Sequence, residues 1–241
     1  MRKPKKLSRD ELAPFVVELP EANPFLPPPR PLGRGAGGEG VSPAETPTPV
    51  GRGEELNWEF LFGNPNPVEV EVGFGKGLFL VSAGTAHPDV NYFGVEIVRK
   101  YQMYAANRVA RRRLTNVKTC CADAKRVLAN HIPPGSVRTV HVFFPDPWWK
   151  TRHKKRLLFT DEFAAGVLRV LQPGGVLHFV TDVKDYFEMV TGLLAMLPAF
   201  RELPPPAENT PQHDMDYLTN FERKFRKEGR PIYRSRYEKV A

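Results

Sequence analysis

The chain lacks the cysteines and the long apolar runs that mark several common classes of protein. Its only cysteines, Cys120 and Cys121, are adjacent, so they rarely bridge each other, and no second pair offers metal-ligand spacing. We therefore expect buried, reduced thiols in a cytoplasmic protein that has no metal site. No apolar run approaches the roughly 20 residues of a membrane-spanning helix, and no apolar segment follows the basic N-terminus as in a secretory signal.

Positive charge, in contrast, is in excess. The 241 residues include 35 Lys and Arg against 27 Asp and Glu, which gives a formal charge of +8. This balance favours a polyanionic partner, either nucleic acid or an anionic membrane surface. The sequence indicates no obligatory protein partner and is compatible with a monomer or a homodimer.

Proline and glycine are concentrated in residues 1–52, where no apolar period is sustained. Such a segment buries too little apolar surface to offset the entropy of ordering it, so we expect a disordered or extended basic extension. The stretch FVVELPEANPFL within it is able to dock as an extended strand. Residues 53–241 carry a globular pattern and are expected to form one domain.

Short β-rich runs alternate with longer amphipathic runs in this second part of the chain. The predicted strands cover 68–73, 91–98, 116–123, 136–146 and 176–182, and the predicted helices cover 77–88, 99–113, 124–131, 160–171 and 185–197. Regular alternation of this kind indicates an α/β fold with a Rossmann-like, doubly wound, mostly parallel sheet. Segments around 199–203 and 231–240 are expected to complete seven strands, with an antiparallel strand at the C-terminal edge.

The first predicted strand leads into EVGFGKG, which contains Gly73, Gly75 and Gly77. Glycines at this place let the backbone turn sharply and let a ligand approach the N-terminus of the next helix. The spacing departs from the dinucleotide fingerprint G-x-G-x-x-G, because position 78 is Leu. A tight turn without a ligand is the alternative.

Four acids fall at the carboxyl ends of successive predicted strands, where open α/β sheets bind their ligands. They are Glu71, Glu96, Asp123 and Asp146. Glu96 follows the glycines by about 20 residues, the spacing at which an acid accepts hydrogen bonds from ribose hydroxyls. Structural roles remain open: Asp123 as a helix N-cap, Glu71 in an ion pair and Asp146 as a turn former.

The segment FFPDPWWKTRHKKR, residues 143–156, joins an acid, two tryptophans and a run of cations. Pro147 restricts Asp146 to extended geometry. Cations position phosphates and aromatic rings stack on extruded bases, so the combination favours RNA. A solvated cationic surface and tryptophans packed in the core are the alternatives.

With EVGFGKG, GVEI, CAD, FFPDPWWKTRHKKR and TNFE in this order, residues 56–240 resemble the tRNA (guanine-N7)-methyltransferase family. The resemblance implies a class I methyltransferase fold, S-adenosylmethionine as methyl donor, and the variable-loop guanine of tRNA as target. It implies tRNA rather than a membrane as the partner. The implied cofactor site comprises Glu71, Gly73, Gly75, Gly77, Glu96, Asp123 and Asp146.

Further site residues follow from matching positions in the family. The resemblance implies substrate binding by Lys150, Asp182, Thr219, Asn220, Phe221 and Glu222, and RNA contacts by Arg152, His153, Lys154, Lys155, Arg156 and Leu157. Many relatives have His at position 149 and Arg at position 157, where this chain has Trp and Leu. Helix capping is an alternative role for Asp182 and for Thr219 and Glu222, which fit a capping box.

The chemistry of guanine N7 decides which residue is most important. N7 has a lone pair and no proton, so methyl transfer needs alignment and stabilisation of positive charge rather than a general base. We therefore predict Asp146 as the catalytic residue, whose carboxylate positions the guanine, with Asp182 as the second candidate. Two other functions remain open, which are methylation of another RNA base and an inert RNA-binding protein of the same fold.

Overall fold

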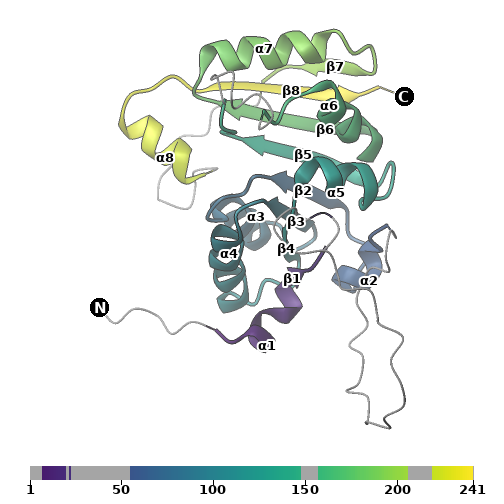
Figure 1. The fold of residues 1–241 in the computed structure, drawn as a ribbon, viewed down its shortest axis with the longest axis vertical. Helices are drawn as coiled ribbons and strands as arrows, with labels where there is room; N and C mark the ends of the chain where they lie inside the picture. The colour runs from purple at the N-terminus through teal and green to yellow at the C-terminus, as the bar shows by residue number, and fades with distance from the viewer. Residues whose placement is uncertain (1–6, 20–21, 23–54, 148–156, 206–218, 241) are drawn as a thin grey trace, which may run out of the picture.

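The computed structural model describes residues 7–19, 22, 55–147, 157–205 and 219–240. At its centre is an eight-stranded sheet with the order β1-β4-β3-β2-β5-β6-β8-β7 (Figure 1). The strands are β1 (Val16–Val17), β2 (Val68–Val72), β3 (Asn91–Glu96), β4 (Val117–Cys121), β5 (Val137–Phe143), β6 (Leu171–Thr181), β7 (Phe200–Leu203) and β8 (Tyr233–Lys239). The helices are α1 (Arg9–Leu12), η1 (Ala13–Phe15), α2 (Trp58–Phe62), α3 (Leu78–Ala86), α4 (Arg99–Arg111), α5 (Ala124–Asn130), α6 (Asp161–Val170), α7 (Lys184–Ala195) and α8 (Asn220–Lys227).

The strand order reverses at the centre of the sheet. The chain runs outward from β2 through β3 to β4, and then returns to the other side of β2 to form β5 and β6, all in parallel. β8 is antiparallel to both β6 and β7. This topology confirms the doubly wound fold, and its switch point lies between β2 and β5, the place where such sheets bind ligands.

An additional edge strand comes from the N-terminal segment. Val16 and Val17 pair in parallel with Thr119 and Cys120 of β4, so the sheet has eight strands rather than the predicted seven. The hydroxyl of Thr119 also donates to the carbonyl of Phe15 at 3.0 Å. Docking of part of FVVELPEANPFL as a strand is therefore confirmed. Residues 23–54 lie outside the described part of the chain, so the expected disorder and domain boundary there remain predictions.

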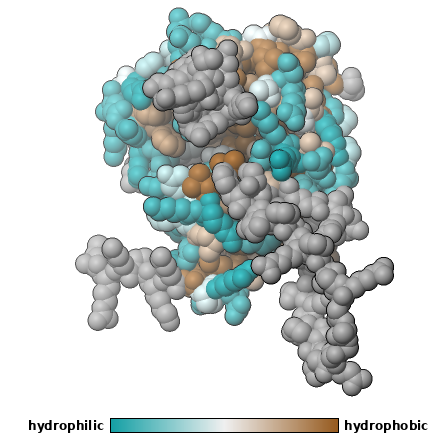
Figure 2. Space-filling model, viewed as in Figure 1, coloured by the Kyte–Doolittle hydropathy of each residue, from teal (hydrophilic) through white to brown (hydrophobic). Residues whose placement is uncertain are grey.

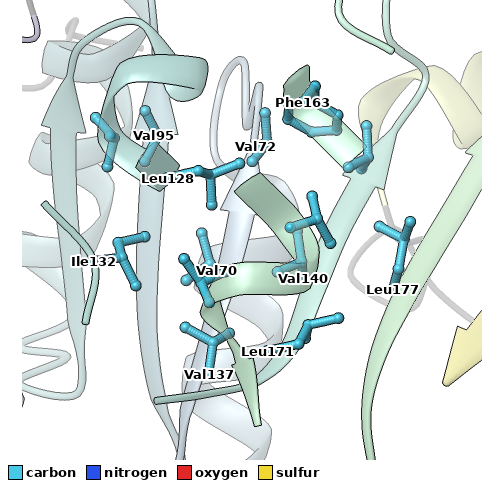
Figure 3. Close-up of a cluster of buried hydrophobic side chains, with 14 of the residues drawn as sticks. Val70, Val72, Val95, Leu128, Ile132, Val137, Val140, Phe163, Leu171 and Leu177 are labelled. Atoms are coloured by element: carbon cyan, nitrogen blue, oxygen red, sulfur yellow. The ribbon is translucent and has the colours of Figure 1, made fainter. Parts of the chain in front are cut away.

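One face of the sheet is apolar and packs against α5, α6 and α7. Val70, Val140 and Leu177 are fully buried on it, facing Leu128 of α5 and Phe163 of α6 (Figure 3). Each such side chain contributes about 1.5–3 kcal/mol when it is buried. Since side chains alternate along a strand, the valines of VEVEV enter this core and the two glutamates point to the opposite face.

The coloured face of the molecule in Figure 2 is mainly polar. In the view of Figure 2, hydrophilic residues cover most of the coloured surface and hydrophobic atoms reach it only in separate areas. Among the described residues, no helix has the length and apolarity needed to cross a membrane.

Candidate active site

The four predicted acids come from adjoining strands or the loops that follow them. Glu71 lies within β2, Glu96 ends β3, Asp123 follows β4 and Asp146 follows β5. Burial raises the pKa of Glu96, and the charge of Asp146 raises it further. The carboxylates from β3 and from the loop after β5 are therefore within electrostatic range of each other, across the switch point.

A glycine loop, residues 73–77, connects β2 to α3 beside Glu96. One oxygen of Glu96 accepts a hydrogen bond from the Gly75 amide at 2.8 Å, and the other accepts from the Val98 amide at 2.9 Å. Gly73 and Gly75 have φ angles of 77° and 51°, and a Cβ on either would meet no atom within 4 Å. The loop therefore has a left-handed backbone that favours glycine, with open space above it.

Two apolar side chains follow Glu96 at the same edge. Ile97 is 44 % exposed and Val98 is 42 % exposed, although the sequence predicts both within the strand 91–98. The strand ends at Glu96 instead, because the carboxylate of Glu96 turns the chain by accepting the Val98 amide. An acid followed by large apolar residues at a strand end is the signal that would have identified this exposed apolar surface.

The two glutamates of β2 have opposite electrostatic environments. Glu71 is 2 % exposed, and its Oε2 atom has no hydrogen-bond partner among the described residues. Burial, and then the charge of Glu96, raise the pKa of Glu71 well above its ordinary value. The ion pair considered for Glu71 belongs instead to Glu69, which accepts from Arg138 at 2.6 Å and contacts His141 Nε2 at 2.8 Å.

Asp123 combines the cap geometry with a contact to the N-terminal segment. Its side chain accepts from the Lys125 amide at 3.0 Å, which makes it the N-cap of α5 as the structural alternative predicted. Its own amide donates to the carbonyl of Ala22 at 2.8 Å. Only one of the two carboxylate oxygens of Asp123 accepts this hydrogen bond, so the capping role does not conflict with ligand binding.

Asp146 is exposed and lies beyond an unusual turn. Phe144 has a φ of 52°, a left-handed conformation that is rare for an aromatic residue, and it ends β5 earlier than predicted. Such backbone strain costs on the order of 1–3 kcal/mol and needs packing to hold it. Phe144 is buried against the ring of Phe225 at 5.5 Å, and its amide donates to the Val180 carbonyl at 2.7 Å.

Helix α8 carries the TNFE residues against this turn. Thr219 is the N-cap and accepts from the Glu222 amide at 3.0 Å, so the predicted capping role is present. Glu222 is 3 % exposed, and its Oε1 accepts from both Arg226 and Arg234 at 3.0 Å. Phe221, in contrast, is 52 % exposed.

Asp182 does not cap the helix that follows it. Val183 is the N-cap residue of α7, and Asp182 forms an ion pair with Arg230, in the loop after α8. Arg230 also lies over the ring of Phe225, 4.2 Å from its centroid. Asp182 and Glu222 are thus both bound by arginines that follow in the sequence, which the sequence did not predict.

Other predictions concern residues beyond the described ranges. Trp148, Trp149, Lys150 and the basic run 152–156 lie outside them. Leu157 is described, and it is partly buried against the main core cluster. Cys120 and Cys121 are buried and form no disulfide with a described residue, as predicted. The described residues contain no cluster of three or more His, Cys, Asp or Glu suited to a metal ion.

Comparison with known proteins shows the family. A family described as "Putative methyltransferase" matches residues 65–235. The tRNA (guanine-N(7)-)-methyltransferase of Rhodopirellula baltica is 44 % identical over 171 residues, which cover 68 % of this chain and 63 % of that protein. The tRNA (guanine-N(7)-)-methyltransferase of Hydrogenovibrio crunogenus is 36 % identical over 167 residues, covering 69 % of this chain and 70 % of that protein. The chain belongs to the tRNA (guanine-N7)-methyltransferase family.

Solved structures support the fold of this methyltransferase. The aminoglycoside resistance methyltransferase NpmB1 superimposes with a TM-score of 0.51 at 18 % identity, over 74 % of this chain and 90 % of that chain. TrmN from Thermus thermophilus gives a TM-score of 0.51 at 16 % identity, over 73 % of this chain and 45 % of that chain. At this identity the likeness shows the fold alone, and the family is shown by the sequence matches.

Proposed function

We propose that the protein transfers the methyl group of S-adenosylmethionine to N7 of the guanine at position 46 in the tRNA variable loop. The observation that carries the proposal is the acidic edge of the sheet, where Glu71, Glu96 and Asp146 adjoin an open glycine loop. Family membership supports the same reaction. Reduced Cys120 and Cys121 are compatible with action in the cytoplasm, where tRNA is modified.

The chemistry of the cofactor fits the residues at this edge. S-adenosylmethionine presents ribose hydroxyls, an adenine ring, an ammonium group and a sulfonium, and it supplies the methyl group. The carboxylate of Glu96 has lone pairs for the hydroxyls, and exposed Ile97 and Val98 offer an apolar surface to the ring. The partnerless, buried Oε2 of Glu71 is suited to accept from the ammonium, and the space above Gly73 and Gly75 admits a ligand.

The placement of the acids makes Asp146 the primary candidate for binding the target base. Asp182 and Glu222 are each neutralised by arginine, whereas Asp146 is exposed beyond the Phe144 turn. A carboxylate at this place accepts from guanine N1–H and the 2-amino group and stabilises the positive charge that develops on the purine. The role of Asp146 is therefore to align N7 with the methyl group, and no proton has to be removed from N7.

Asp182, Thr219 and Glu222 act through the position of α8 in this proposal. Glu222 is too buried to reach solvent, and its bond with Arg234 fixes the helix against β8, while Arg226 of the same helix also binds it. The exposed ring of Phe221 then faces solvent beside Phe144, 6.4 Å between ring centroids, where it is able to stack on an extruded base. Lys150 and the basic run 152–156 are proposed to hold the surrounding phosphates.

The test is methyl transfer to unmodified tRNA followed by nucleoside mass spectrometry and mapping of the modified base. We expect 7-methylguanosine in the variable loop, and we expect Asp146→Asn to lower kcat/KM by at least about 100-fold, a loss of about 2.7 kcal/mol of transition-state stabilisation. Asp185→Asn is the matched control, because Asp185 is an exposed acid in the first turn of α7. A methyl group on another atom, or equal rates for both variants, would overturn the assignment.

A further inference from the structure

Helix α4 presents a stripe of aromatic and cationic residues along one of its faces. Tyr101, Tyr104, Arg108 and Arg112 follow one another at intervals of three, four and four residues, which places them on the same side of the helix. Tyr101 is 38 % exposed and Tyr104 is 53 % exposed. The helix begins three residues after Glu96, so this stripe starts at the acidic edge and runs away from it.

Cations from two other segments meet the stripe. Arg108 donates from Nη1 to the carbonyl of Lys76 at 2.9 Å, which brings α4 next to the glycine loop. Burial lowers the pKa of Arg108, and the charges of Arg112 and of Arg223 in α8 lower it further. The guanidinium groups of two helices that are far apart in sequence therefore repel one another here, consistent with α4 and α8 lying on the same side of the sheet (Figure 1).

Lys76, Arg108 and Arg112 differ from other cations of the described residues in having no carboxylate partner. Arg99 at the start of α4 pairs with Glu18, and Arg201 of β7 pairs with Glu238. Within the described parts of the chain, Lys76, Arg108 and Arg112 form no ion pair with an acid. A cluster of cations without carboxylates is a site for an external anion, and guanidinium forks match the oxygens of phosphate.

We propose that the cationic rim formed by Lys76, Arg108 and Arg112, together with Tyr104, binds the phosphodiester backbone of the tRNA beside the target guanine. The proposal rests on the proposed function, and it adds a contact surface separate from the basic run 150–156. Arginines hold phosphates and a tyrosine hydroxyl donates to phosphate or ribose oxygen, so this surface positions the RNA without reading its sequence. Its place beside the acidic edge favours an RNA substrate over an anionic membrane.

The experiment compares the salt dependence of tRNA binding between variants. Unmodified tRNA is titrated with wild-type protein, with Lys76→Gln/Arg112→Gln and with the control Arg201→Gln at salt concentrations between about 50 and 200 mM. The slope of log K against log salt is negative, and each lost phosphate contact should reduce its magnitude by about 0.7–0.9. We expect this magnitude to decrease by about 1.4–1.8 for the double variant and to stay at the wild-type value for Arg201→Gln and for the charge-conserving Arg112→Lys.

Two controls separate this proposal from the proposed function. Calorimetry with S-adenosylhomocysteine should give the wild-type affinity for Arg112→Gln alone and for Arg201→Gln, because Arg112 and Arg201 lie outside both the acids and the glycine loop. If the wild-type protein methylates tRNA but the double variant keeps the wild-type tRNA affinity and salt slope, the rim proposal is wrong and the proposed function stands. Wild-type protein that neither binds nor methylates tRNA would refute both proposals. Preferential loss of binding to phosphatidylserine vesicles, with tRNA binding intact, would assign the rim to a membrane.

Discussion

Glu69 and Glu71 offer a test in which two substitutions of the same kind, two residues apart, should have opposite effects. Burial opposes the ionisation of Glu69, but bonds with His141 and Arg138 outweigh it and lower the pKa from 4.5 to about 2. The pKa difference of about 2.5 corresponds to about 3 kcal/mol of stability at neutral pH, since each pKa unit is worth 1.36 kcal/mol. Solvent screening is small, because the side chain of Glu69 is only 12 % exposed.

Glu69→Gln should therefore lower the free energy of unfolding at pH 7 by about 3 kcal/mol, a decrease of about 6–12 °C in Tm. A carboxylate with a lowered folded pKa contributes stability above its unfolded pKa, and this contribution is lost as pH falls through the folded pKa. Urea unfolding at several pH values should accordingly show that the variant loses much of the acid dependence that the wild type has between about pH 5 and 2.

Glu71→Gln is the matched substitution. In the wild type, burial raises the pKa of Glu71 in the folded state. The contribution of Glu71 to stability is therefore present below the unfolded pKa and is lost as pH rises through the folded pKa. The Gln variant should therefore gain stability relative to wild type as pH rises above the ordinary pKa of a glutamate, while calorimetry should show weaker cofactor binding. If both variants are destabilised equally at pH 8, or if neither changes the pH dependence, the assignment of the two environments is wrong.

Three further predictions concern the site. Arg234→Met should lower the free energy of unfolding in denaturant melts by about 2–3 kcal/mol, because it removes one of the two arginines bound to buried Glu222, whereas Lys224→Met in an exposed pair should change it by less than about 0.5 kcal/mol. Glu96→Ala should weaken S-adenosylhomocysteine binding at least about tenfold by calorimetry and leave the Kd for tRNA unchanged, and an equal loss of both would contradict the cofactor role. Phe221→Ala should lower kcat/KM for tRNA about tenfold or more while stability stays within about 0.5 kcal/mol, and an unchanged kcat/KM would exclude base stacking.

The sheet was predictable from sequence because its central strands are buried on both faces. Runs such as VEVEV and NYFGVE are rich in β-branched and aromatic residues and are bounded by glycine, proline or asparagine, which makes each strand visible locally. Helix α4 was also predicted nearly to its observed end. These elements are specified by residues close together in the chain, so the sequence was sufficient to assign the four acids to the ends of successive strands.

The features that were not predicted depend on contacts between distant residues. The left-handed Phe144 precedes a proline, a context that predicts extended backbone, and its packing against Phe225 holds it in place. Asp182 is paired with Arg230, 48 positions later in the sequence, so a local reading could offer only helix capping as its structural alternative. β1 has only two residues among prolines, and only pairing with β4 defines it as a strand.

The Pro/Gly-rich segment is flanked on both sides by residues that are anchored to the domain. Ala22 is fully buried and accepts from the Asp123 amide, and Leu56 donates to the carbonyl of His131, so both ends of residues 23–54 are fixed to the domain. Residues 23–54 therefore join two points that are anchored to the domain. The entropic cost of connecting two anchored points rises by only about 0.6 kcal/mol for each doubling of the connecting length, so insertions or deletions between Ala22 and Glu55 should have little effect on stability. A single proteolytic cut within this segment would leave the edge strand attached by its own contacts, and the nicked protein should migrate as one particle until it is denatured.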